Sequence, residues 1–136
     1  MELLDTTLRE GEQAAGIMFS LAQKKKILYE LDDFGMDFIE IGHPAVNEKI
    51  MNDVAELAKI KTEAMKLVHS RAMEKDIMLA SGSGADYVWI FLCTSELGMN
   101  AKYSFSWKEA LSRINGSVRL ARKEGLKVRF TAEDAT

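Results

Sequence analysis

Apolar runs alternate with amphipathic, helix-like segments along the whole chain. Five runs are short and are apolar at most positions, which predicts strands that are covered on both faces. Runs of this kind favour a parallel sheet, because a sheet with one solvated face gives a strict apolar–polar alternation instead. The five predicted strands are Glu2–Asp5, Asp37–Gly42, Ala64–His69, Ala85–Cys93 and Leu126–Thr131.

Four helices are predicted between these strands. The first and the last begin with a serine that is followed three residues later by Gln or Glu, which is the spacing of a capping box, and both end at a glycine. Their segments are Ser20–Gly35, Val46–Ile60, Met73–Ser81 and Ser106–Gly125. The resulting β-α-β-α-β-α-β-α-β order indicates repeated right-handed βαβ units. It fits either an open doubly wound sheet or part of a (β/α)8 barrel.

Composition narrows the class of protein. The chain has 136 residues, of which 47% are hydrophobic and 29% charged, as expected for one globular domain. Its 21 acidic and 18 basic residues are too evenly balanced for a nucleic-acid partner that is bound through its phosphates. It has neither an apolar run of about 18 residues nor a signal peptide, so we expect no membrane association. The single cysteine, Cys93, fits a reducing compartment, so we expect a cytoplasmic protein.

Polar and ionisable residues collect where the predicted strands end. Carboxyl ends of parallel strands share one face of a sheet, and α/β enzymes place their sites there. The alternative that these are ordinary loop residues without a shared site remains open, because loops are polar in any protein of this class. The residues expected to converge on one pocket are Arg9, Glu10, Glu40, His43, Arg129 and Glu133.

Two of these charges lie inside predicted strands. Glu40 interrupts the apolar run FIEIG, and Arg129 lies within KVRFT. A charge in a covered strand is costly unless it is paired or functional. Two interpretations are therefore open, a structural Glu–Arg bridge in the interior or a direct role in catalysis. His69 is interpreted as a structural residue at a strand end rather than as a ligand.

The segment LDTTLREGEQ at residues 4–13 resembles the signature of the metal-dependent Claisen-condensing acyltransferases, which include isopropylmalate, citramalate and homocitrate synthases. Hydroxymethylglutaryl-CoA lyases are more distant relatives of that family. Glu10 stands where many members have aspartate, which favours the homocitrate synthase branch. Three later segments follow in the family's order, so the resemblance covers essentially the whole chain: IEIGHP at 39–44, FLCTS at 91–95 and VRFTAED at 128–134.

The resemblance implies a (β/α)8 TIM barrel, of which this chain holds about the first five strands and four helices. Residues 1–136 are then the N-terminal part of an acyltransferase catalytic domain, since such a barrel needs about 250 residues. We expect a piece of a longer enzyme or one subunit of a split enzyme, inactive by itself. Unpaired sheet edges imply a homo-oligomer or a complementary half-barrel subunit. The alternatives are a non-catalytic half-barrel that binds a partner or persists as a remnant, and an acyl-CoA lyase.

The implied reaction condenses acetyl-CoA with a 2-oxo acid, 2-oxoglutarate being favoured, and releases CoA. It requires a divalent metal, which is Mg, Mn or Zn, with further ligands outside this chain. By resemblance, Glu10 is the metal ligand, and Arg9 and Glu133 are the catalytic residues. The residues that the resemblance assigns to substrate binding are Gln13, Glu40, His43, Arg129 and Thr131.

Overall fold

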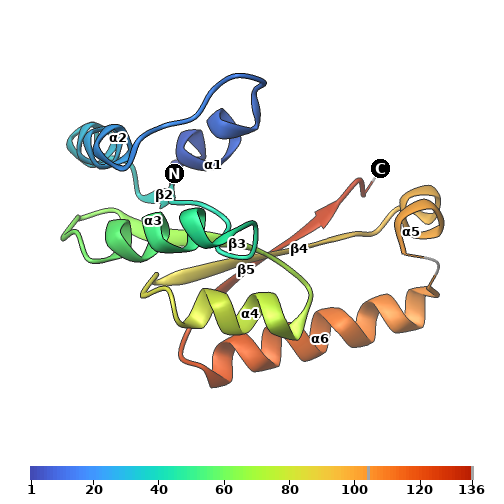
Figure 1. Cartoon of the computed structure of the whole chain (residues 1–136). Coiled ribbons are helices and arrows are strands. Elements are labelled where there is room, and N and C mark those ends of the chain that lie inside the picture. Colours follow the sequence, from blue (N-terminus) through green and yellow to red (C-terminus); the bar gives the residue numbers. More distant parts are fainter. Residues whose placement is uncertain (104, 136) are drawn as a thin grey trace.

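The computed structural model describes residues 1–103 and 105–135. Five parallel strands form one sheet in the order β1-β2-β3-β4-β5, and the long helices cover its outer face (Figure 1). The bounds are β1 Leu4–Asp5, β2 Phe38–Glu40, β3 Met65–Arg71, β4 Tyr87–Cys93 and β5 Lys127–Glu133.

The strand order decides between the two architectures that the pattern left open. A doubly wound sheet reverses its strand order at a switch point, whereas each strand here pairs with its predecessor in the chain. Consecutive parallel strands that are joined by helices on one face are the arrangement of a (β/α)8 barrel. The chain thus forms a half-barrel, with the concave face of its sheet turned away from the covering helices.

The four predicted helices are confirmed. Each is shorter than the predicted segment by one to four residues in total. Both capping boxes form: Ser20 Oγ accepts from the Gln23 backbone N–H, and Ser106 Oγ accepts from the Glu109 backbone N–H. The last helix runs without interruption through Gly116. The helices are α2 Leu21–Asp33, α3 Glu48–Ala58, α4 Glu74–Ser81 and α6 Trp107–Lys123.

Some expectations about local structure were wrong. The segments after the first and fourth strands are not simple polar loops, because they contain α1 (Thr7–Glu10), the 3-10 helix η1 (Gly11–Gln13) and α5 (Glu96–Lys102). Helices this short hold too few turns for a helical period to appear in the sequence. The strand bounds also differ: β1 has only two residues, and β3 and β5 extend two residues further than expected.

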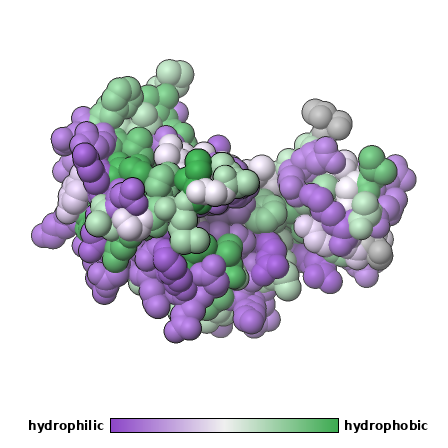
Figure 2. Space-filling view, turned by 45° about the horizontal axis from the view of Figure 1, so that its top comes forward, coloured by the Kyte–Doolittle hydropathy of each residue, from purple (hydrophilic) through white to green (hydrophobic). Residues whose placement is uncertain are grey.

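The hydrophobic core lies between the outer face of the sheet and the helices. It is built on strand positions that alternate with the concave face, such as Ile39, Val68, Val88 and Ile90, all fully buried. The intervening positions place polar and aromatic side chains on the concave face. Figure 2 shows the surface hollowed between the body that carries α1–α3 and the smaller lobe that carries α5. Within the described residues, no helix is long and apolar enough to cross a membrane.

Candidate active site

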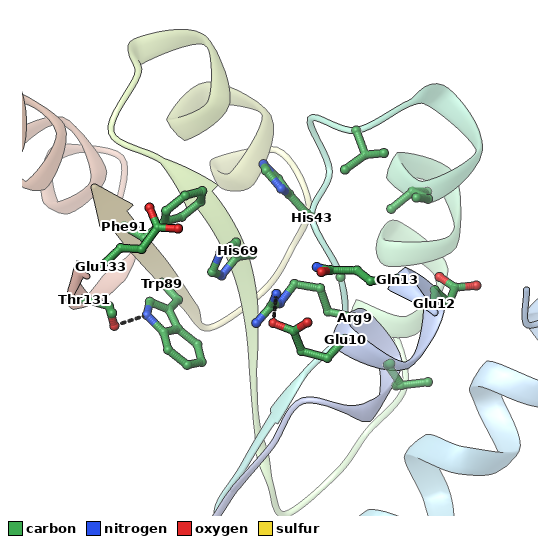
Figure 3. A pocket seen from close by; sticks show the side chains of 14 residues that line it. Arg9, Glu10, Glu12, Gln13, His43, His69, Trp89, Phe91, Thr131 and Glu133 are labelled. Carbon is green, nitrogen blue, oxygen red and sulfur yellow. Dashed lines mark hydrogen bonds and ion pairs between the residues drawn. The ribbon is translucent and has the colours of Figure 1, made fainter. Parts of the chain in front are cut away.

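A cavity of about 610 Å³ opens at the carboxyl ends of the strands. The helices after β1 form one side of it and the ends of β4 and β5 form the other, with β3 between them (Figure 3). Six of the eight residues that the sequence assigned to a site line this cavity, namely Arg9, Glu10, Gln13, His43, Thr131 and Glu133. The other polar and aromatic residues that line it are Glu12, His69, Trp89 and Phe91.

Glu40 lies beneath the cavity with no exposed surface. Its Oε2 is 2.7 Å from Arg9 Nε, and its Oε1 is 2.9 Å from His69 Nδ1. Arg9 also contacts the carboxylate of Glu10 through Nη1. The Glu–Arg bridge considered from the sequence therefore exists in the interior, but its arginine comes from α1. The buried Glu40 carboxylate thus contacts both Arg9 and His69, whose side chains face the cavity.

Arg129 is not among the residues that line the cavity. Its guanidinium lies 4.4 Å from the centre of the Trp89 ring, to which it is also the register partner across β4 and β5. Trp89 in turn donates a hydrogen bond from Nε1 to the hydroxyl of Thr131. Arg129 thus lies on the concave face, one level below Thr131, and contacts the cavity wall through the indole.

Two histidines occupy the middle of the cavity. His69 stacks on Phe91 with ring centres 4.4 Å apart, and its ring centre lies 5.6 Å from that of His43. His43 Nε2 is 3.5 Å from the carboxylate of Asp76, which accepts two hydrogen bonds from Arg71. Burial and the neighbouring His69 lower the pKa of His43, and they outweigh the opposing effect of Asp76. His43 is therefore a neutral imidazole at pH 7.

The sequence interpretation placed His69 at a strand end, whereas β3 continues past it to Arg71. Its side chain lies on the concave face and reaches the cavity, with 13% of its surface exposed. Trp89 and Phe91 were not identified as cavity residues. The two-residue period of β4 could have indicated them, because alternate positions of a strand share one face.

Glu133 lies on the β5 side of the cavity, opposite Arg9 and Glu10 (Figure 3). Its Oε1 accepts a hydrogen bond of 3.1 Å from Lys102 Nζ, and this bond is the main reason why the pKa of Lys102 is raised. Its Oε2 is buried and has no hydrogen-bond partner among the described residues. One carboxylate oxygen at the cavity is thus oriented by an ammonium group while the other is left to accept a proton.

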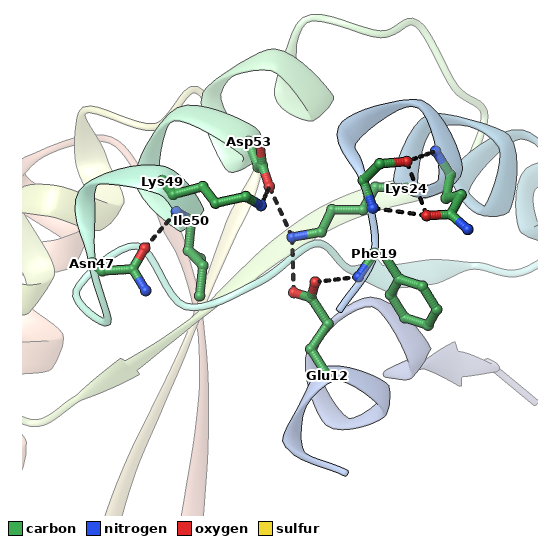
Figure 4. Close-up of polar contacts among 9 residues, drawn as sticks. Glu12, Phe19, Lys24, Asn47, Lys49, Ile50 and Asp53 are labelled. Atoms are coloured by element: carbon green, nitrogen blue, oxygen red, sulfur yellow. Dashed lines mark hydrogen bonds and ion pairs between the residues drawn. The ribbon is translucent and has the colours of Figure 1, made fainter. Parts of the chain in front are cut away.

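A buried lysine orders the loop that carries Glu10 and Gln13 (Figure 4). Lys24 of α2 is 2% exposed, and its Nζ lies 2.8 Å from Glu12 Oε2 and 3.0 Å from Asp53 Oδ2. The other oxygen of Glu12 accepts from the Phe19 backbone N–H. Burial raises the pKa of Asp53, but hydrogen bonds from Lys49 and Lys24 outweigh it, so the pKa is lowered overall. The cluster joins η1, α2 and α3, and so fixes one wall of the cavity.

The cavity residues fit one ligand position of a divalent metal. The Glu10 carboxylate is half-exposed at the cavity, and a hard oxygen donor suits Mg²⁺ or Mn²⁺. Nowhere in residues 1–103 or 105–135 do three or more His, Cys, Asp or Glu side chains form a group that holds a metal. Further ligands would have to come from outside the described residues.

Comparison with known sequences identifies relatives over the whole chain. The family model described as HMGL-like matches residues 1–136. A homocitrate synthase of Pyrococcus abyssi is 42% identical over 134 residues, which cover 98% of this chain and 37% of that protein. A homocitrate synthase of Sulfurisphaera tokodaii is 41% identical over 138 residues, which cover 98% of this chain and 30% of that protein. The chain thus spans roughly a third of the length of these curated relatives.

Solved structures confirm the fold class. A hydroxymethylglutaryl-CoA lyase from Pseudomonas aeruginosa superposes with a TM-score of 0.78 at 21% identity, over 95% of this chain and 44% of that one. The HMG-CoA lyase of Bacillus subtilis gives a TM-score of 0.77 at 17% identity, over 95% of this chain and 45% of that one. The half-barrel described above is therefore part of a (β/α)8 architecture that also occurs in these enzymes.

Proposed function

Because the chain belongs to the HMGL-like family, we propose that residues 1–136 form the N-terminal part of the catalytic domain of a metal-dependent acyltransferase. The full-length protein condenses acetyl-CoA with a 2-oxo acid, in the first place 2-oxoglutarate, and releases CoA and homocitrate. Support comes from homocitrate synthases that are 41–42% identical to this chain over the 134–138 aligned residues. The 136-residue chain is inactive alone, since it supplies only Glu10 as a metal ligand.

One observation carries this proposal: the cavity places Arg9 and Glu10 opposite Glu133, with His69 between them (Figure 3). Glu10 would hold a divalent metal, which would supply Lewis-acid polarisation of the 2-oxo group. Arg9 is oriented by Glu40 from below, and its guanidinium would stabilise the negative charge that develops on the 2-oxo oxygen. This role needs the buried ion pair, because a freely rotating arginine would lose that orientation.

Glu133 is the proposed base. Its Oε2, which has no hydrogen-bond partner in the part of the chain that the structure describes, accepts a proton from the methyl group of acetyl-CoA, and the electron pair left behind forms the enolate. The enolate carbon then attacks the 2-oxo carbon, whose C=O π pair moves to the oxygen, and that oxygen takes up a proton to become a hydroxyl group. Water then cleaves the C–S bond of the thioester, which leaves a carboxylate and releases CoA as the thiol. Thr131 and His43 line the cavity beside this path and are proposed to bind the carboxylates of the 2-oxo acid.

Three further residues complete the proposed binding site. Gln13, at the end of η1, is proposed to contact the substrate beside Glu10. Glu40 acts from beneath, since it touches Arg9 and His69 and has no exposed surface. Arg129 is proposed to attract the second carboxylate of a dicarboxylic acid from below the Trp89 ring.

Thiol release from acetyl-CoA by the full-length protein tests this function. With Mg²⁺ or Mn²⁺ present we expect release that depends on a 2-oxo acid and is fastest with 2-oxoglutarate, with homocitrate identified by mass spectrometry. A chelator abolishes it, and Arg9→Ala lowers kcat about 100- to 1,000-fold. Absence of thiol release with every 2-oxo acid contradicts the proposal. Cleavage of an acyl-CoA in the absence of any 2-oxo acid indicates a lyase instead.

We further propose a cytoplasmic homo-oligomer, or association with a complementary half-barrel subunit. Among the described residues, strand β5 pairs with β4 alone, and Phe130 on it is 37% exposed. In a split enzyme this edge would be covered by the complementary subunit, and in a single longer chain by a later strand of the same protein. Sedimentation of the full-length protein measures the oligomeric state, and a monomer with all its strands paired internally would contradict this proposal.

A further inference from the structure

We propose that Lys102 is a positioning residue for Glu133, and that the short helix α5 holds the Lys102 ammonium group beside the Glu133 carboxylate. The inference rests on the proposed function, because it concerns the carboxylate that takes the methyl proton. Lys102 is the last residue of α5, and its Nζ donates to Glu133 Oε1 at 3.1 Å. The bond directs one oxygen away from the cavity and leaves Oε2, buried and unpartnered among the described residues, as the proton acceptor.

The base of α5 is packed so closely that its position leaves little freedom. A Cβ added at Gly98 would lie 2.2 Å from Cys93 Sγ and 2.8 Å from Ser95 Oγ, so only glycine allows the helix to approach the end of β4 this closely. Ser95 caps α5 by accepting from the Gly98 backbone N–H. The first turn of α5 is therefore in close contact with the end of β4, while the last residue of the helix reaches β5 through the Lys102–Glu133 hydrogen bond.

Contacts from the start of α5 also fix the backbone that carries Glu133. The Thr94 backbone N–H donates to the Glu133 carbonyl at 2.9 Å, and the Ser95 hydroxyl donates to Asp134 Oδ2 at 2.5 Å. Asp134 adopts a φ of 54°, a left-handed conformation that is unfavourable for most side chains and that this hydrogen bond helps to maintain. Thr94 and Ser95 at the start of α5 thus fix the main chain around Glu133, and Lys102 at its end orients one oxygen of the Glu133 carboxylate.

A double-mutant cycle in the full-length protein tests the inference. We expect Lys102→Met to lower kcat about 10- to 100-fold, a part of what a general base contributes, with the KM for the 2-oxo acid changed less than about twofold. Lys102→Arg restores most of the activity, since it keeps a cation in the same place. In a Glu133→Gln background, Lys102→Met causes no further loss. The matched control is Lys108→Met on α6, an exposed lysine whose replacement leaves kcat unchanged.

Two readouts separate positioning from a merely structural role. Thermal unfolding of the Lys102 variants is expected to match that of the wild type, because the side chain is exposed. Exchange of the acetyl-CoA methyl protons in D2O, followed by NMR, falls in parallel with kcat. The inference is overturned if Lys102→Met lowers kcat equally in the wild-type and the Glu133→Gln backgrounds, or if it leaves kcat unchanged in an otherwise active enzyme. Neither result contradicts the proposed function. A wild-type protein that releases no thiol overturns the proposed function and the inference together.

Discussion

Arg9 Nε lies 2.7 Å from Oε2 of Glu40, a carboxylate that has no exposed surface. The pair joins α1, which follows β1, to the end of β2, and the same carboxylate contacts His69 on β3. A buried charge is tolerated where partners of opposite sign replace the water that it has lost. Glu40 therefore connects α1, β2 and β3 and orients two groups at the cavity.

Replacement of Glu40 by Gln is expected to lower the free energy of unfolding by about 3 kcal/mol or more, because it leaves the Arg9 guanidinium without its buried counter-charge. Glu63→Gln, at an exposed position, serves as the control and is expected to change stability by less than about 0.5 kcal/mol. Denaturant unfolding of both variants measures the difference. Equal stability of the two would show that the Arg9–Glu40 pair contributes nothing.

Glu10→Ala in the full-length protein is expected to weaken Mn²⁺ binding at least about 100-fold, since loss of a direct ligand exceeds the 10- to 100-fold typical of outer-shell partners. Calorimetric titration measures the affinity. Glu48→Ala, at the exposed start of α3, is the matched control and should bind Mn²⁺ as the wild type does. Unchanged binding by the Glu10 variant would remove Glu10 from the ligand set.

The pKa of His43 is lowered, so stability is expected to depend on pH in the range where imidazole titrates. The unfolded chain takes up a proton near the ordinary value of 6.5, whereas folded His43 resists it beside His69 and Arg71 despite the nearby Asp76. Stability is fully present well above that value and declines as the pH falls through it toward the lower pKa of folded His43.

His43→Gln is expected to reduce this dependence in the same pH range. Unfolding free energies of the variant and the wild type at several pH values make the comparison. A wild-type protein that becomes more stable on acidification through this range would be inconsistent with a neutral, buried His43.

Two glycine substitutions are expected to have opposite effects on thermal stability. Gly98→Ala forces a Cβ against Cys93 Sγ, and such overpacking costs about 1–3 kcal/mol. Gly116→Ala, inside α6 with nothing within 4 Å of the added carbon, stabilises by about 0.5–1 kcal/mol. Adding Cys93→Ala to the first variant should restore part of its loss. If the added alanine at 98 proves harmless, α5 does not pack on Cys93 as described.

Much of the fold could be predicted from local signals. Capping boxes act over four residues, so Ser20 and Ser106 marked the starts of α2 and α6 correctly. Continuous apolar runs located all five strands, although their ends differed by up to two residues. The helices α1 and α5 were missed because they have only four and seven residues, too few turns for a helical period to appear in the sequence.

By itself the sequence determined that strands and helices alternate, that charged residues lie at the strand ends, and that LDTTLREGEQ opens the chain. Only the tertiary structure decided which charges meet. Glu40 pairs with Arg9 and not with Arg129, because β1 and β2 are neighbours in the sheet while β5 lies three strands away from β2. Such pairing depends on strand order and on the face to which a side chain points, and neither can be read from a local pattern of residues.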